Sequence, residues 1–431
     1  GSAAWAQALR LLELVEIPAA PQRLREYPHL LSGGMRQRVM IALAMACEPA
    51  LLIADEPTTA LDVTTQAQIL GLVRELQAKH GTGVLFITHD FGVVAEIADR
   101  VAVMRAGRVV ETGTRDEVLR RPRDPYTRLL IAAVPSLTPR HRTLPPARPG
   151  QPQPAPVLRT AGLGKVYSSG RFPRKRRVVP AAEGVTLEIR RGEVLGIVGE
   201  SGSGKSTVAR CVARLLAPSS GEVWLGSDEI GRLPLRRLHP HRRRVQLVFQ
   251  DPYRSLNPRR TVGASIVEGP MNYGIASSEA WRRAAELMGL VRLDADALGR
   301  YPHQFSGGQR QRICIARALA MEPELLIADE AVSALDVSVQ AQVLRLLDQV
   351  RERLNLAMLF ITHDLRVAAQ VCDRVAVMHR GRIVEQGDVA QIFAEPRHEY
   401  TKALFAAAPG RGYDFGGVAD ALQSRPSSSS V

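Results

Sequence analysis

The sequence predicts an α/β protein that contains one domain twice, the first time without its front half. Short apolar runs alternate with helical patterns, as is typical of α/β domains. Three landmarks recur at one offset (329 − 55 = 274): Ser32 and Ser306, Asp55 and Asp329, and His89 and His363. A glycine-rich loop at 199–207 occurs once. This tandem duplication therefore joins an incomplete copy to a complete one.

The chain length of 431 residues allows two or three domains with sizeable cores. Hydrophobic residues make up 45% of the sequence, which is ordinary for a globular protein. No apolar run approaches the roughly 18 residues that a membrane helix needs. The first residues lack the pattern of a signal peptide. A function at a membrane would therefore require docking onto a partner that spans it.

The formal net charge of +14 raises the possibility of nucleic-acid binding. Much of the excess lies in two clusters, 171–177 (RFPRKRR) and 236–244 (RRLHPHRRR). Neither cluster is interleaved with stacking aromatic residues, and neither belongs to a known nucleic-acid module. Solvated loops that face an anionic membrane surface explain them more simply, so we expect no nucleic-acid partner.

The four cysteines are scattered, without the spacing of a disulfide framework or a metal site. This usage fits a reducing cytosolic compartment. Cys47 and Cys314 fall on the helices expected after two Ser-Gly-Gly turns, where small buried thiols are expected.

Composition divides the chain into four parts. Residues 1–135 hold the incomplete copy and residues 157–410 the complete one. The Pro-rich stretch 136–156 between them is typical of an extended, semi-rigid tether. Residues 411–431 end in RPSSSSV and are expected to be disordered.

The sequence predicts several buried strands, each followed directly by polar residues. Val194–Val198 (VLGIV) leads into the glycine-rich loop, and Thr207–Leu216 continues from that loop as a helix. Leu325–Ala328 and Met358–Ile361 end at Asp329 and near His363. The carboxyl ends of parallel strands are where an open α/β sheet binds its ligand.

Two further helices are predicted outside this alternating pattern. Trp281–Leu293 is an amphipathic helix of the complete copy, and Trp5–Val15 resembles it in the first copy. Aligning the two requires a gap of about two residues. The first copy therefore begins inside this helical insert.

The glycine-rich loop matches G-x-x-x-x-G-K-[ST], with a strand before it and a helix after it. It consists of Gly199, Glu200, Ser201, Gly202, Ser203, Gly204, Lys205, Ser206 and Thr207. Its glycines allow backbone N–H groups to surround a phosphate at the helix N-terminus. Lys205 is expected to bridge the β- and γ-phosphates, and Ser206 to bind Mg²⁺. This pattern predicts a P-loop NTPase fold and a nucleoside triphosphate ligand.

Asp329 and Glu330 follow the apolar run at 325–328, and Asp55 and Glu56 repeat the pattern. A carboxylate at such a strand end holds the Mg²⁺ shell. Glu330 beside it could accept a proton from the attacking water or orient it.

Two Ser-Gly-Gly turns each open a helix. Serine is a good N-cap, and the glycines expose backbone N–H groups to an anion. They are Ser32, Gly33 and Gly34 in the first copy and Ser306, Gly307 and Gly308 in the second.

Together these motifs resemble the ATP-binding subunit of an ABC transporter. FSGGQ at 305–309 is similar to the family signature, and LSGGM at 31–35 is a degraded version. Gln250 resembles the Q-loop glutamine, the SALD stretch at 333–336 the D-loop and His363 the switch histidine. Tyr167 stands where the family stacks an aromatic ring on adenine. The resemblance implies ABC ATPase domains with a helical signature subdomain.

Finer features resemble the peptide/nickel importer branch, whose members take up di- and oligopeptides. Both copies end in similar tails, RDPYT at 123–127 and RHEYT at 397–401, and DPYRSLNP at 251–258 also matches. The resemblance implies two membrane-spanning permease subunits, an extracytoplasmic substrate-binding protein, and a peripheral place on the cytoplasmic face of the plasma (inner) membrane. No cysteine follows the first tail at 136–156, so an iron–sulfur site is not supported.

The family pairs its domains head to tail, with each ATP between the loop of one and the Ser-Gly-Gly turn of the other. Carried over, Glu330, His363 and Gln250 are catalytic, and Ser206, Gln250 and Asp329 surround Mg²⁺. They face the turn at 32–34. Asp55, Glu56 and His89 have no nucleotide, and the turn at 306–308 is left for a possible second ABC domain.

The first copy lacks a stretch equivalent to 157–278. We expect its remaining strands to have an unpaired edge and a partly uncovered core. The chain is accordingly interpreted as a fragment of a longer tandem protein, with Gly1 and Ser2 a cloning remnant. Met35 replaces the usual signature glutamine, which weakens the γ-phosphate contact, and Ala331 replaces a proline, which is expected to be tolerated.

Three functions stay open on this evidence. The first is an ATPase that powers peptide import through separate membrane subunits. The second is a soluble ABC ATPase that acts on nucleic acid or the ribosome, supported only by the basic clusters. The third is an interaction module without catalysis, motivated by the missing half domain.

Overall fold

The structure, a computed structural model, describes residues 2–58, 61–140, 155–169, 177–333, 335–413 and 415. The chain divides into two compact units. One contains residues 1–134 and 404–431, and the other residues 135–403. Helices and strands alternate through both, so the α/β prediction is confirmed.

The 135–403 unit is built on a six-stranded sheet with the order β10-β11-β12-β7-β13-β14. Strand β7 (Val194–Val198) lies between β12 and β13, and all five of its residues are buried. The first five strands in this order run parallel, whereas β14 runs antiparallel to β13. The other strands are β10 (Val245–Val248), β11 (Leu325–Asp329), β12 (Ala357–Ile361), β13 (Arg374–His379) and β14 (Arg382–Asp388).

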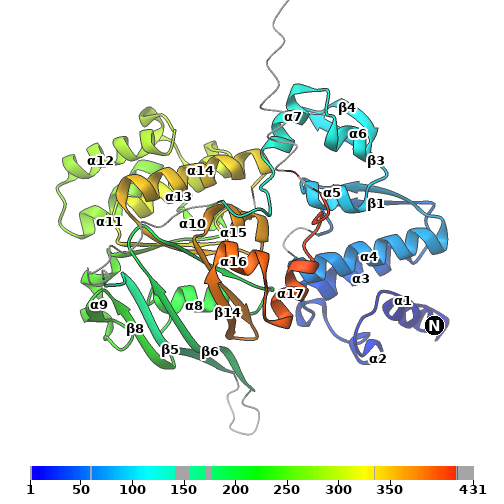
Figure 1. The fold of residues 1–431 in the computed structure, drawn as a ribbon, viewed down its shortest axis with the longest axis horizontal. Helices are drawn as coiled ribbons and strands as arrows, with labels where there is room; N and C mark the ends of the chain where they lie inside the picture. The colour runs from blue at the N-terminus through cyan, green and yellow to red at the C-terminus, as the bar shows by residue number, and fades with distance from the viewer. Residues whose placement is uncertain are drawn as a thin grey trace, which may run out of the picture. The chain divides into compact units, whose positions relative to one another are not determined.

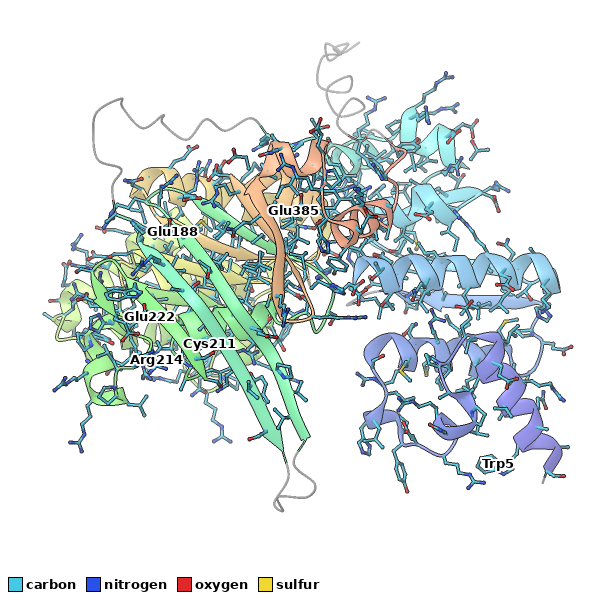
Figure 2. All side chains as sticks on the ribbon, turned by 60° about the horizontal axis from the view of Figure 1, so that its bottom comes forward. Trp5, Glu188, Cys211, Arg214, Glu222 and Glu385 are labelled. Carbon is cyan, nitrogen blue, oxygen red and sulfur yellow. The ribbon has the colours of Figure 1, made fainter. Side chains whose placement is uncertain are left out.

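A second, antiparallel sheet of this unit has the order β6-β5-β8-β9. One apolar core joins it to the parallel sheet and includes Leu158, Ile197 and Leu359. Figure 2 labels Glu188 and Glu222 on this sheet. Its strands are β5 (Leu158–Ser169), β6 (Arg177–Ile189), β8 (Ser220–Leu225) and β9 (Asp228–Glu229).

Helices of the same unit fall into two groups. One group packs together away from β5 and β6 (Figure 1) and forms the predicted helical subdomain. It contains α10 (Pro252–Ser255), α11 (Val262–Asn272), α12 (Ser277–Leu290), η3 (Ala295–Gly299), η4 (Pro302–Gln304) and α13 (Gly307–Leu319). The others are α8 (Lys205–Val212), α9 (Leu235–Arg242), α14 (Val337–Leu354), α15 (Leu365–Val371) and α16 (Val389–Ala394). Helix α17 (Glu399–Ala406) begins in this unit, and its last three residues belong to the other unit.

In the other unit the sheet is reduced to two separate pairs of strands. β1 (Leu51–Asp55) pairs with β2 (Gly83–Ile87), and β3 (Arg100–Arg105) pairs with β4 (Arg108–Thr114). Its helices are α1 (Ser2–Leu14), α2 (Ala20–Arg23), η1 (Pro28–Leu30), α3 (Gly33–Met45), α4 (Val63–His80), α5 (Phe91–Ile97), α6 (Arg115–Arg120) and α7 (Pro125–Ala132). Trp5, labelled on α1 in Figure 2, is exposed.

These strand pairs expose apolar side chains on one side. Ile53 is 61% exposed and Leu85 is 51% exposed. Among the described residues of this unit, no strand takes the place that β7 holds between β12 and β13. The predicted uncovered core and open edge are therefore confirmed.

The predicted elements differ from the structure mainly at their ends. Strand β7 has the predicted bounds, whereas β11 and β12 are each one residue longer than predicted. The helix predicted over Thr207–Leu216 starts earlier and ends at Val212, because Arg214 adopts a left-handed backbone with φ 53°. The helices predicted near Trp281 and Trp5 both begin earlier, as α12 and α1.

The Pro-rich stretch begins as packed structure rather than as a free tether. Gln370 on α15 donates its side-chain amide to the carbonyls of Ser136 and Thr138 at 3.0 and 2.9 Å. The backbone N–H of Arg140 donates to the carbonyl of Ala369 at 3.2 Å. The prediction of a tether over 136–156 is thus wrong for its first five residues, and 141–154 lie outside the described residues.

The sequence-based prediction also places the start of the disordered tail, residue 411, too early in the chain. Phe415 is 2% exposed and packs with Ala95, Leu119 and Ile131. Gly410 donates its N–H to the carboxylate of Glu96 at 3.4 Å. Large apolar contacts outweigh the polar composition here. Residues 414 and 416–431 lie outside the described residues.

Two smaller expectations have different outcomes. Cys314 is buried on α13, as expected. Cys47 is exposed, so its expected burial is wrong. The reason is that α3 ends at Met45, which leaves Cys47 beyond the helix.

Candidate nucleotide site

The glycine-rich loop joins β7 to α8, as the sequence predicts. Gly199, Gly202 and Gly204 have φ values of 148°, 77° and 108°. A Cβ on Gly199 would lie 2.1 Å from the carbonyl oxygen of Met378, and one on Gly204 would lie 2.1 Å from that of Ala181. Only glycine fits these two positions, because both the backbone angle and the space exclude a side chain.

Lys205 and Ser203 provide donors inside this loop. Lys205 is buried, and its Nζ donates to the carbonyls of Gly199 and Glu200 at 2.7 Å each. The hydroxyl of Ser203 is buried and has no hydrogen-bond partner among the described residues. An ammonium and an unused hydroxyl at the start of a helix suit a phosphate group.

Ser206 and Asp329 meet beside the loop. The Ser206 hydroxyl donates to Oδ1 of Asp329 at 2.8 Å. Burial raises the pKa of Asp329, although the hydrogen bond from Ser206 works in the opposite direction. A hydroxyl and a carboxylate are hard oxygen ligands of the kind that Mg²⁺ prefers, with further ligands from nucleotide phosphates. The two residues therefore fit a Mg²⁺ ion.

Glu330, His363 and Gln250 form a second group at the same strand ends. Nδ1 of His363 lies 3.6 Å from Oε1 of Glu330. The side-chain amide of Gln250 donates to Oε2 of Glu330 at 2.8 Å and to the hydroxyl of Ser333 at 3.4 Å. Glu330 itself has a left-handed backbone, with φ 50°, at the turn after β11.

This group keeps Glu330 ionised. Its burial favours the protonated form, but His363 and the charge of Lys205 together outweigh that effect and lower the pKa of Glu330. Burial alone would lower the pKa of His363, but Glu330 and the charge of Asp364 together outweigh it and raise that pKa. A buried carboxylate held ionised beside a histidine is suited to accept a proton from water or to orient it.

Tyr167 lies apart from these contacts. It is on β5, its side chain is 41% exposed, and Nζ of Lys165 lies 5.6 Å from its ring centroid. An exposed ring beside a cation suits stacking on a base. Its role in adenine binding stays a prediction.

The two Ser-Gly-Gly turns differ in their capping. Ser306 and Gln309 form a reciprocal capping box on α13, with bonds of 3.3 and 2.9 Å. Among the described residues the Ser32 hydroxyl accepts the N–H of Met35 alone, at 3.2 Å, and no return bond reaches the Ser32 N–H, because a methionine side chain has no group to accept it. Loss of this cap is a structural effect of Met35 beyond the expected loss of phosphate contact.

The glycines of these turns also have different surroundings. A Cβ on Gly34 would lie 2.4 Å from Thr65, and one on Gly308 would lie 2.1 Å from Val339. A Cβ on Gly33 has no neighbour within 4 Å, and one on Gly307 meets only the Tyr253 hydroxyl at 3.9 Å. The second glycine thus serves close helix packing, and the first leaves the turn open to a ligand.

The first copy keeps the acidic pair and histidine. Nδ1 of His89 lies 2.9 Å from Oε1 of Glu56, and Glu56 has φ 45° like its counterpart Glu330. Its unit has no glycine-rich loop between the strands that the structure describes. In the D-loop stretch, Ser333, Leu335 and Asp336 are described, and Ala334 lies outside the described residues.

Comparison with known proteins places this site in a family. The chain matches the model described as "ABC transporter" over residues 3–59 and 182–333. It matches "Oligopeptide/dipeptide transporter, C-terminal region" over residues 110–169 and 384–415. The "Glutathione import ATP-binding protein GsiA" of Salmonella typhimurium is 48% identical over 98% of this chain and 70% of its own length. The chain belongs to the ABC transporter ATP-binding proteins.

Two further proteins are similar to this chain, over different shares of its length. The protein of the same name from Escherichia coli strain K12 is 49% identical over 94% of this chain and 68% of its own length. A solved structure titled "Dimeric structure of a post-hydrolysis state of the ATP-binding cassette MJ0796 bound to ADP and Pi" is 29% identical, with a TM-score of 0.49, over 54% of this chain and 98% of its own. In the part of the chain that the structure describes, no helix has the length and apolarity to cross a membrane.

Proposed function

We propose that this chain binds ATP with Mg²⁺ at the 199–207 loop and hydrolyses it to drive import of small peptides. The main support for the proposal is that two sets of contacts meet at the adjacent residues Asp329 and Glu330. Ser206 bonds Asp329, and Glu330 is held by both His363 and Gln250. Phosphoryl transfer depends mainly on positioning and charge stabilisation, which this arrangement supplies.

Each residue has a definite task in this mechanism. Lys205 and the loop N–H groups would bind phosphate oxygens, and Ser206 with Asp329 would hold the magnesium ion, with Gln250 as a further oxygen ligand. The ion supplies charge neutralisation at the phosphates. Glu330 orients the attacking water or accepts its proton. His363 keeps Glu330 ionised.

A complete site would also need a Ser-Gly-Gly turn. Ser32, Gly33 and Gly34 of the first copy are proposed to close the nucleotide against the 199–207 loop. The open surroundings of Gly33 support this role. Ser306 to Gly308 would then serve a second ABC domain, and Asp55 and Glu56 would have no catalytic task.

The peptide substrate is proposed from the match to the oligopeptide/dipeptide transporter C-terminal region. The curated relatives named above are glutathione importers, and glutathione is itself a tripeptide. Transport would require two membrane-spanning permease subunits and an extracytoplasmic substrate-binding protein. The chain would then act peripherally on the cytoplasmic face of the inner membrane.

Part of the charge of the basic cluster at 236–244 is used within the fold. Arg244 lies 2.6 Å from Asp228 and 2.7 Å from Glu324 in ion pairs, so its charge is used within the fold. The other basic cluster, 171–177, lies outside the described residues except for the backbone of Arg177.

The test is calorimetry with Mg²⁺ and AMP-PNP, a non-hydrolysable ATP analogue. We expect one site per chain, lost in Lys205→Ala because the buried ammonium is removed from the loop. Two sites per chain, or binding that survives Lys205→Ala, would contradict the assignment of the 199–207 loop as the site. Thermal unfolding of the variant without nucleotide checks that it is folded.

A further inference from the structure

The tail that follows the second copy reaches back to its phosphate loop. Glu200 in the loop donates its backbone N–H to the hydroxyl oxygen of Tyr400, 3.1 Å away and 200 residues later in the chain. We propose that Tyr400 is a positioning residue for nucleotide binding, which fixes the 199–207 loop through the Gly199–Glu200 peptide. This inference rests on the nucleotide site proposed around Lys205.

The Gly199–Glu200 peptide is held on both sides. Its N–H, which belongs to Glu200, bonds Tyr400 at 3.1 Å, and its carbonyl, which belongs to Gly199, accepts Nζ of Lys205 at 2.7 Å. Loss of the first bond would allow this peptide to rotate and would displace an acceptor of the buried lysine. A loop that is already in its binding shape spends less free energy on ordering when the ligand binds. The Tyr400 hydroxyl should therefore affect affinity more than turnover.

The ring of Tyr400 is fixed by stacking. Its centroid lies 3.9 Å from that of His379, with 12° between the planes. His379 ends β13, and the turn after it also contacts the loop, because Gly381 donates its N–H to the carbonyl of Ser203 at 2.9 Å. The tail and the β13–β14 hairpin therefore each form a hydrogen bond with the 199–207 loop.

The start of α17, which carries Tyr400, is anchored as well. Glu385 on β14, labelled in Figure 2, accepts the N–H groups of Arg397 and His398 at 2.8 and 3.0 Å. Burial works against its ionisation, but the nearby Thr401 hydroxyl and these two N–H groups lower the pKa of Glu385. An ionised carboxylate makes the stronger bonds that fix the chain just before Tyr400.

The first copy has a similar tail, but the described part of its unit has no phosphate loop. Glu111 accepts the N–H groups of Arg123 and Asp124 at 2.8 and 3.1 Å, as Glu385 does in the second copy. The guanidinium of Arg105 lies 4.9 Å from the ring centroid of Tyr126, in the place that His379 takes beside Tyr400. Tyr126 is thus a matched control, with the same anchor and a stacked ring but no phosphate loop in the described part of its unit.

The experiment compares Tyr400→Phe with Tyr126→Phe in the full chain. The probes are AMP-PNP with Mg²⁺ for affinity and ATP for steady-state kinetics. We expect Tyr400→Phe to raise Kd and KM about 2- to 10-fold, the effect of one typical hydrogen bond, with kcat within about twofold. Tyr126→Phe should leave all three values unchanged.

Tyr400→Leu separates the hydroxyl from the ring. If Tyr400→Phe keeps the wild-type KM while Tyr400→Leu raises it, the ring packs and the hydroxyl positions nothing, which overturns the inference. Equal effects of Tyr400→Phe and Tyr126→Phe would also overturn it. A wild-type chain that binds no AMP-PNP, or whose binding survives Lys205→Ala, would remove the proposed site and this inference together. Normal wild-type binding with an unaffected Tyr400→Phe would remove only the inference.

Discussion

The two copies carry one identical strand in two different environments. LLIAD forms β1 at Leu51–Asp55 and β11 at Leu325–Asp329. All five residues are buried in β11, whereas β1 has only Leu52 buried. The sequence of a strand therefore fixes its conformation here, while its neighbours determine its burial.

An equivalent of β7 is among the elements that the described part of the first copy lacks. In the second copy β7 pairs with both β12 and β13, and its carboxyl end leads into the phosphate loop. The equivalent strands of the first copy, β2 and β3, belong to separate pairs. In the second copy β7 thus joins β12 to β13 and leads into the loop. The comparison separates what the acidic pair and histidine do by themselves from what they do beside a phosphate loop.

Glu330→Gln and Glu56→Gln test that separation most strongly. Glu330→Gln should reduce ATP turnover by roughly 100-fold or more while AMP-PNP binding is kept, because the ionised carboxylate is lost beside His363. Glu56→Gln should leave turnover within about twofold, although Glu56 also contacts a histidine. Steady-state ATPase assays of both variants provide the measurement. A large loss in Glu56→Gln would show that the first copy takes part in catalysis.

Leu359→Ala and Leu85→Ala test the difference in burial. The two leucines occupy equivalent positions, but Leu359 is fully buried and Leu85 is 51% exposed. Leu359→Ala should cost about 2 to 5 kcal/mol of unfolding free energy through the cavity it leaves. Leu85→Ala should change it by about 0.5 kcal/mol or less. Denaturant unfolding checks both, and an equal cost would mean that the exposed face is covered in solution.

Much of the second copy could be predicted because its signals are local. The loop motif, the apolar run before it and the acidic strand end each depend on a few adjacent residues. The contact of Tyr400 with Glu200 could not be predicted this way, since it joins residues 200 positions apart through a backbone N–H that has no sequence signal. The repeated tails do indicate that this tyrosine matters, because both copies have one at the equivalent position.

The sequence-based predictions are wrong at positions where packing outweighs composition. The polar and Pro-rich surroundings of Ser136 and Phe415 favour disorder, yet both segments find partners at equivalent positions, Gln370 and Glu96. The expected burial of Cys47 failed because helix α3 ends two residues earlier. The surroundings of such residues depend on distant elements, so neighbouring sequence carries little information about them.

The Glu330–His363 pair makes the second copy sensitive to pH. Because the pKa of His363 is raised, its protonated form stabilises the fold below about pH 6.5, and this stabilisation is lost as pH rises through the folded pKa. Because the pKa of Glu330 is lowered, its contribution is present above about pH 4.5 and is lost as pH falls through the folded pKa. Glu330→Gln should lower the pKa of His363, as followed by NMR of labelled histidines. Glu56→Gln should leave it unchanged, and a shift in that variant would contradict the local origin of the effect.

Met35→Gln makes the smallest change and sharpens the comparison at the Ser-Gly-Gly turns. A glutamine at this position could return a hydrogen bond to the N–H of Ser32, as Gln309 does for Ser306 at 2.9 Å. The added cap should stabilise α3 by about 0.5 to 1 kcal/mol. Gln309→Met should cost a similar amount at α13, and denaturant unfolding measures both. If Met35→Gln also lowers the KM for ATP, the turn of the first copy contacts the nucleotide. If it changes stability alone, the replacement affects only the helix start, and the proposed closing role of Ser32 to Gly34 loses support.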